Sequence, residues 1–190
     1  GYESVIRFDK KTEREITINF PLYSSVADLY IGLDENAVLK KSRGYKHKKP
    51  IVFYGSSITQ GGCASRPGNA YPALITHKTN IDHTNLGFSG ACVAEPRMAD
   101  YIASLPMCAF VYDYDYNARC AEYLNATHEP FFKKIREAHP SLPVIILSAP
   151  YNAKDGDDRT RRDIIKATYD NAIANGDKNV YFIDGGSIFE

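Results

Sequence analysis

Three short polar segments of the chain carry the residue types that acyl transfer requires. Ser57 lies in Gly55-Ser56-Ser57-Ile58-Thr59, Gly90 ends the segment Asn85-Leu86-Gly87-Phe88-Ser89-Gly90, and Asn117 follows a third apolar run. A serine hydroxyl can attack an ester carbonyl, and a backbone N–H and a carboxamide can stabilise the oxyanion that then develops. The three segments together could therefore form a site for nucleophilic chemistry on a carbonyl group.

Apolar runs that alternate with helical patterns must position these segments. Strand patterns cover residues 50–54, 82–87, 108–115, 143–150 and 180–184, and helical patterns cover 70–78, 95–105, 131–138 and 159–174. This alternation predicts βαβ units and hence an α/β, three-layer, flavodoxin-like fold with a parallel five-stranded sheet. Ligands of such sheets bind outside the carboxyl ends of the strands, where all three polar segments fall.

The first part of the chain has a different pattern. Residues 5–8, 15–20 and 26–33 alternate apolar and polar side chains, which is typical of half-buried strands. The sequence therefore predicts a short β segment over residues 1–40, which we interpret as the remnant of an N-terminal β domain. A basic linker over 41–49 and the main domain over 50–190 follow.

The polar segments resemble the sequence blocks of GDSL/SGNH hydrolases. Gly55-Ser56-Ser57-Ile58-Thr59 is similar to the G-D-S-[LI] block, with Ser57 at the position of the nucleophile. Gly90 matches the oxyanion-hole glycine of the second block, and Asn117 falls where the G-x-N-D block carries its oxyanion-binding amide. Segments 61–68 and 134–140 resemble the subgroup with an N-terminal β domain. The resemblance implies a serine esterase with an oxyanion hole formed by Ser57, Gly90 and Asn117.

The sequence departs from the family pattern at several positions. Ser56 replaces the usual aspartate, while Asp115 and Ala118 replace the glycine and aspartate that flank Asn117. Family members take the base histidine and its orienting aspartate from a D-x-x-H-P motif after the last strand, and the sequence ends at Glu190 before such a motif. We therefore expect a C-terminally truncated hydrolase domain that is weakly active or inactive by itself, because loss of a triad member removes most of the rate.

The five histidines offer no clear substitute for that base. His139 ends a helix before the amino end of a strand, and His77 and His83 bracket the entrance to the second strand. His47 lies in the linker. Only His128, which precedes the helical pattern at 131–138, is placed where it could lie near the pocket.

Other residues near the three segments have two interpretations. Ser56, Arg66 and Tyr71 are candidates for lining the pocket, although Arg66 and Tyr71 equally fit surface packing. Cys63 and Cys92 follow neighbouring strand ends, so a disulfide between them is one possibility.

The proposed site residues themselves also have structural alternatives. Ser57 could cap the helix that follows it, Gly90 could serve a positive φ, and Asn117 could form an Asx turn.

Composition limits the possible partners. The 23 basic and 23 acidic side chains give a formal net charge of zero, so charge does not favour binding to nucleic acid or to an anionic membrane. No apolar stretch reaches the roughly 20 residues of a membrane helix, and the start does not resemble a signal peptide, which favours a cytoplasmic location without fixing the compartment. Neither a metal nor an organic cofactor is indicated, and the expected partner is a small-molecule or carbohydrate ester.

Three functions remain open at this level. The resemblance favours carboxylic ester hydrolysis, with deacetylation of a carbohydrate as the specific case. A flavodoxin-like phosphate- or nucleotide-binding module is an alternative, because a glycine-rich turn between a strand and a helix can bind phosphate. Non-catalytic carbohydrate binding is the third. Flavin absorbance in the purified protein would favour the second function over the first.

Overall fold

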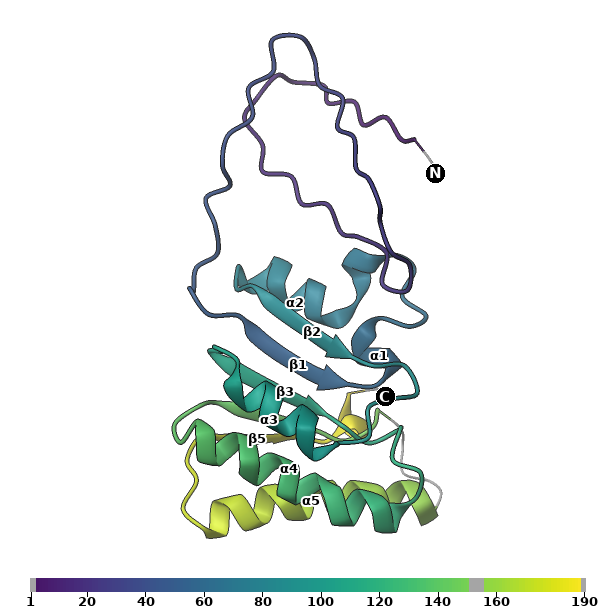
Figure 1. The fold of residues 1–190 in the computed structure, drawn as a ribbon, viewed down its shortest axis with the longest axis vertical. Helices are drawn as coiled ribbons and strands as arrows, with labels where there is room; N and C mark the ends of the chain where they lie inside the picture. Colours follow the sequence, from purple (N-terminus) through teal and green to yellow (C-terminus); the bar gives the residue numbers. More distant parts are fainter. Residues whose placement is uncertain (1–2, 151–155, 189–190) are drawn as a thin grey trace.

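The computed structural model describes residues 3–150 and 156–188. From residue 51 onward, one parallel β-sheet forms the centre of the fold (Figure 1). Its strands are β1 (Ile51–Gly55), β2 (His83–Gly87), β3 (Ala109–Asp113), β4 (Val144–Leu147) and β5 (Val180–Ile183). They pair in the order β2-β1-β3-β4-β5, and every pair is parallel. The parallel five-stranded sheet expected from the apolar runs is confirmed.

Helices cover both faces of this sheet, as the three-layer fold requires. They are α1 (Ser57–Gln60), α2 (Tyr71–Thr79), α3 (Pro96–Ser104), α4 (Ala121–Ala138) and α5 (Gly156–Ala174), with 3₁₀ turns η1 (Pro67–Asn69) and η2 (Gly185–Ser187). Within the described residues, no helix combines the length and apolar character needed to cross a bilayer.

The two faces of β1 show why the sheet is covered on both sides. Val52 and Tyr54 pack into the larger core with α3, α4 and α5, whereas Phe53 packs into a smaller core with Tyr71 and Ile75 of α2. Successive side chains of a strand point to opposite faces, so a strand with two covered faces is apolar throughout. All five residues of β1 are buried.

Helix α4 begins well before the position that the sequence pattern predicts. The pattern predicts a helix over residues 131–138, but the helix runs from Ala121 and contains Pro130 in its interior. Proline removes one hydrogen bond from a helix. Here Pro130 is exposed, and so is Ala126, whose carbonyl loses its i+4 partner and can be hydrated instead. The buried face of α4, which includes Leu124 and Phe131, stabilises the helix across this position.

The predicted N-terminal strands are not present in the structure. Residues 3–49 form extended chain without strand pairing, drawn as the open purple-to-blue loop of Figure 1. Apart from Leu22, their apolar side chains are exposed to solvent; Ile6, for example, is 72% exposed. Three short alternating segments cannot bury their apolar faces without a further sheet to pack on, so the pattern alone does not produce strands. The assignment of residues 1–40 to a β domain remains a prediction.

Two glycines bring α1 against the ends of the strands. A β-carbon on Gly87 of β2 would lie 2.1 Å from the backbone nitrogen of Gln60, and one on Gly55 of β1 would lie 2.0 Å from the hydroxyl oxygen of Thr59. No larger residue fits either space. Glycine at these two strand ends therefore fixes the short helix that carries Ser57 to the carboxyl edge of the sheet.

Candidate active site

Ser57 is the first residue of α1, just beyond the end of β1. Ser56 caps this helix, because its hydroxyl accepts a hydrogen bond from the backbone N–H of Ile58 at 3.2 Å. Capping therefore belongs to Ser56, which is only 2% exposed and serves the helix rather than an open pocket. Ser57 is half-buried, and its backbone N–H, at the first helical position, has no partner within the helix.

The loop after β2 carries Gly90 in a tight turn. The N–H of Ala91 donates to the carbonyl of Phe88 at 3.1 Å, and Gly90 has a φ of 71°. A positive φ at the third position of such a turn favours glycine, so this structural role of Gly90 is confirmed. The side chain of Gln60 in α1 accepts a hydrogen bond from the N–H of Ser89 at 2.9 Å, which ties the turn to the Ser57 helix.

The loop after β3 carries Asn117 and is held by α5. Arg161 donates hydrogen bonds to the carbonyls of Asp115 and Ala118, at 3.3 and 3.0 Å, on either side of Asn117. The Asp115 carboxylate accepts a further bond from the N–H of Ala149 at 3.2 Å. A buried guanidinium can bind several acceptors in a fixed geometry. The backbone around Asn117 is therefore rigidly placed.

The side chain of Asn117 is only partly used by its surroundings. Its carbonyl oxygen is buried and has no hydrogen-bond partner among the described residues. Buried polar atoms without partners are rare in folded proteins, and they often mark functional positions. An Asx turn would have used this oxygen, so the Asx-turn interpretation of Asn117 is not supported.

The register of the sheet places the three loops next to one another. Gly55, at the end of β1, pairs with Gly87 of β2 on one side and with Asp113 of β3 on the other. Ser57, Gly90 and Asn117 thus follow the carboxyl ends of three adjacent strands. This is the edge at which open parallel sheets bind their ligands.

A buried polar cluster around Thr59, two residues after Ser57, was missed by the sequence analysis. The Asp113 carboxylate accepts hydrogen bonds from the hydroxyls of Thr59, at 2.7 Å, and Tyr71, at 3.0 Å. Tyr71 therefore joins α2 to α1 and β3 through this cluster, although it was expected to line the pocket. The signal in the sequence was an aspartate at the end of an apolar strand; its partners lie on separate elements and could not be read from spacing.

The environment of Asp113 changes its protonation. Burial is the largest effect, and the pKa of Asp113 is raised to about 6. The hydrogen bonds from Thr59 and Tyr71 lower this pKa, and the nearby carboxylate of Asp115 raises it. The same burial and the negative charge of Asp113 raise the pKa of Tyr71. Asp113 thus changes charge close to neutral pH.

This raised pKa gives a testable dependence of stability on pH. Because folding raises the pKa of Asp113 from 3.8 to about 6, the folded state binds its proton more tightly, and ionisation costs stability as pH rises across this window. We expect the melting temperature of Asp113→Asn, relative to the unmodified protein, to increase from pH 4 to pH 7. The total change corresponds to at most about 3 kcal/mol. Thermal denaturation at four pH values measures it, and a difference that falls with pH would contradict the assignment.

None of the five histidines lies beside Ser57. His128, which was expected near the pocket, is fully buried between α4 and α5, where its Nδ1 lies 2.8 Å from the hydroxyl oxygen of Thr168. Burial lowers its pKa to about 3. It stacks on Tyr112 at 4.5 Å between ring centroids, so the expectation was wrong and His128 belongs to the core.

The other histidines lie where the sequence predicts them, away from the carboxyl edge. His83 begins β2, and His139 follows α4, with its side chain 2.8 Å from the carbonyl of Ala103. His77 lies in the last turn of α2, and His47 precedes β1.

Two further expectations have clear outcomes. All four cysteines are free, so Cys63 and Cys92 form no disulfide; Cys63 is exposed and Cys92 is buried. Arg66 is exposed at the start of η1 and caps it with no side-chain hydrogen bond.

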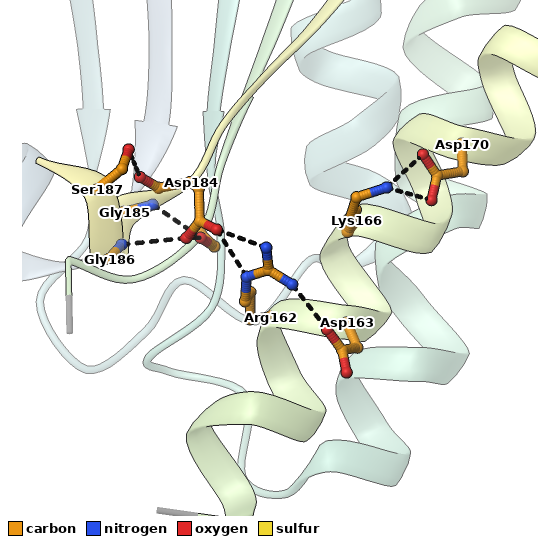
Figure 2. Close-up of polar contacts among 9 residues, drawn as sticks. Arg162, Asp163, Lys166, Asp170, Asp184, Gly185, Gly186 and Ser187 are labelled. Atoms are coloured by element: carbon orange, nitrogen blue, oxygen red, sulfur yellow. Dashed lines mark hydrogen bonds and ion pairs between the residues drawn. The ribbon is translucent and has the colours of Figure 1, made fainter. Parts of the chain in front are cut away.

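The carboxyl end of β5 is anchored to α5 by an ion pair (Figure 2). Arg162 donates to Asp184 through Nε at 2.8 Å, and Asp184 also accepts from the N–H of Gly186 in η2 at 3.1 Å. The Arg162 guanidinium lowers the pKa of this carboxyl. Figure 2 shows Arg162 also reaching Asp163, so the guanidinium bridges two carboxylates. Asp184 thus fixes the turn that leaves the last strand.

Known proteins share both sequence pattern and fold with this chain. Residues 48–190 match the GDSL-like Lipase/Acylhydrolase family. A protein named as a GDSL-like lipase from Bacteroides ovatus ATCC 8483 is 30% identical with a TM-score of 0.63, and the match covers 72% of this chain and 42% of that chain. No curated protein matches the chain.

Two more distant solved structures share the fold. The salicylyl-acyltransferase SsfX3 from a tetracycline biosynthetic pathway is 23% identical with a TM-score of 0.64, covering 74% of this chain and 44% of that chain. A family two carbohydrate esterase from Clostridium thermocellum is 17% identical with a TM-score of 0.57, covering 77% of this chain and 56% of that chain. The chain spans less than half the length of the first two of these three structures.

Proposed function

Because the chain belongs to the GDSL-like lipase/acylhydrolase family, we propose that it carries the nucleophile and the oxyanion hole of a serine ester hydrolase. Ser57 is the nucleophile. The backbone N–H groups of Ser57 and Gly90 and the side-chain amide of Asn117 stabilise the oxyanion.

One observation supports this assignment most strongly. Ser56 supplies the helix cap, which leaves the hydroxyl of Ser57 free of that structural task at the carboxyl end of β1. The neighbouring loop is held by Arg161 through the backbone carbonyls of Asp115 and Ala118, so the side-chain NH2 group of Asn117 takes no part in fixing it. A hydroxyl and an amide at adjacent strand ends are the groups that attack on an ester requires.

The reaction proceeds in two steps. The Ser57 oxygen adds to the ester carbonyl and loses its proton to a base, the carbonyl oxygen becomes an oxyanion bound by the three donors, and the alcohol leaves with a proton from that base. Water then attacks the acyl-serine and releases the acid. None of the five histidines is placed to act as this base, so the proposal requires a base outside the described residues, as the D-x-x-H-P motif of the family supplies.

A carbohydrate acetyl ester is the proposed substrate. The carbohydrate esterase from Clostridium thermocellum supports this choice through its shared fold, and its structure is a complex with cellohexaose. SsfX3 is a salicylyl-acyltransferase, as its name states, so a protein of this fold also transfers an acyl group. The acyl group is proposed to be short.

Covalent trapping of the nucleophile tests this function. An alkyl fluorophosphonate should modify Ser57 in the longest natural protein that carries this chain, with fluoride as the leaving group, and should abolish hydrolysis of 4-nitrophenyl acetate at the same rate. Peptide mass spectrometry distinguishes Ser57 from Ser56 after digestion. Full ester hydrolysis with no modification of Ser57 would contradict the proposal.

A further inference from the structure

A short piece of the extended N-terminal segment lies against the loop that follows Ser57. We call residues 19–23 the N-terminal strap. Between residues 3 and 49, Leu22 is the one side chain that is not exposed. Its carbonyl accepts a hydrogen bond from the side-chain nitrogen of Gln60 at 3.1 Å, and Figure 1 shows the dark loop returning beside α1. The strap is thus bound to the Ser57 helix.

Three glycines let the strap approach this closely. A β-carbon on Gly61 would lie 2.3 Å from the side chain of Leu22, and one on Gly68 would lie 3.0 Å from the side-chain nitrogen of Asn19. A β-carbon on Gly62 would lie 2.9 Å from the hydroxyl of Tyr23. The loop from 61 to 68 therefore has its small residues where the strap makes contact.

The contact at Gly62 places Tyr23 beside the nucleophile. The same point that lies 2.9 Å from the Tyr23 hydroxyl lies 3.4 Å from the β-carbon of Ser57. The Tyr23 side chain is 56% exposed, so its hydroxyl remains accessible to a ligand. No described residue forms a hydrogen bond with it. A free phenol at this distance can contact the atoms of an ester that is bound to Ser57.

We propose that Tyr23 is a substrate-contacting residue that binds a hydroxyl group next to the scissile ester. This inference rests on the proposed function and adds a determinant of specificity to it. A phenol both donates and accepts hydrogen bonds, so it suits a neighbouring hydroxyl of a polyhydroxylated alcohol better than a hydrocarbon. The strap thereby brings a specificity residue to the site from outside the α/β domain.

A pair of matched esters, assayed with the longest natural protein that carries this chain, tests the proposal. The substrates are a monoacetylated methyl glucoside, which has hydroxyls next to the ester, and cyclohexylmethyl acetate, which has none. Tyr23→Phe removes only the hydroxyl. One neutral hydrogen bond lost at a half-exposed site lowers kcat/KM for the sugar ester by about 3- to 10-fold. The value for cyclohexylmethyl acetate stays within about twofold, since that ester offers no hydroxyl to bind.

Two further variants guard the interpretation. Tyr30→Phe removes a hydroxyl from a side chain that is 89% exposed in the same segment. This variant should leave kcat/KM unchanged for both esters. Leu22→Ala weakens the strap contact and should reproduce the selective loss. Equal values of kcat/KM before and after Tyr23→Phe, or an equal loss on both esters, would overturn the proposal.

A binding measurement separates this inference from the proposed function. In a Ser57→Ala background the sugar ester is not consumed, and calorimetry should show its Kd rising by the same 3- to 10-fold when Tyr23→Phe is added. An unchanged Kd would overturn the role of Tyr23. Hydrolysis that survives Ser57→Ala would contradict the proposed function. In that case, the ratio of kcat/KM for the sugar ester to kcat/KM for cyclohexylmethyl acetate would still test the role of Tyr23.

Discussion

In the longest natural protein that carries this chain, replacing Ser57 by alanine should lower kcat for ester hydrolysis by at least about 10³-fold, the loss expected when a nucleophile is removed. The residual rate reflects the oxyanion donors alone. Because Ser56 and not Ser57 caps α1, the variant should keep its melting temperature within about 2 °C, since substitutions away from structural contacts change stability little. Steady-state hydrolysis of 4-nitrophenyl acetate and thermal denaturation measure the two effects.

Ser56→Ala is the matched control for this prediction. It removes the side-chain oxygen that accepts from the N–H of Ile58, at a cost of about 1 kcal/mol in stability. It should therefore lower the melting temperature more than Ser57→Ala does while retaining far more activity. Two adjacent serines with opposite effects on stability and rate would be difficult to explain without the assigned roles. Equal activity in Ser57→Ala and in the unmodified protein would contradict the assignment of Ser57 as the nucleophile.

Replacing Asn117 by alanine should lower kcat by about 10²- to 10³-fold, the typical effect of removing one oxyanion-hole donor. KM should change little, because the donor acts on charge that develops only in the transition state. The fold should tolerate the change: Arg161 holds the loop through the carbonyls of Asp115 and Ala118, and neither bond involves the Asn117 side chain.

The Asn117→Asp variant distinguishes hydrogen-bond donation by the side-chain amide from the space that the side chain fills. The carboxylate has nearly the same volume as the amide, but it donates no hydrogen bond when ionised and repels an oxyanion. Its kcat should fall at least as far as that of the alanine variant. An effect confined to KM, or a loss below about threefold in both variants, would show that another group stabilises the oxyanion.

Periodic features of the fold were predictable from the sequence because they are local. β1 is buried on both faces, so all of its side chains are apolar and the strand can be recognised from the sequence. The helix that ends at Ala174 is followed by Gly176, whose φ of 85° favours glycine at this position. Such patterns depend on residues a few positions apart. The five strands and the alternation of helices followed from them, and with these the edge at which Ser57, Gly90 and Asn117 lie.

The differences between the structure and the sequence expectations concern segments whose packing depends on residues far away in the chain. Residues 5–33 have the alternation of strands, yet they remain extended because the structure offers them no sheet to join. His128 has a polar side chain at a plausible position, but the packing of α4 on α5 buries it against Thr168. In both cases the pattern states a preference, and the presence or absence of a packing partner decides the outcome.

By itself, the sequence determined the type of sheet, the positions of the three polar strand ends and the resemblance that links them to ester hydrolysis. Only the tertiary structure decided that Ser56 rather than Ser57 caps α1, that Asp113 joins Thr59 and Tyr71 in a buried cluster, and that Tyr23 lies near Ser57. The physical reason is the range of the interactions. Burial patterns act within a few residues, whereas these contacts join segments that become neighbours only when the layers of the fold pack together.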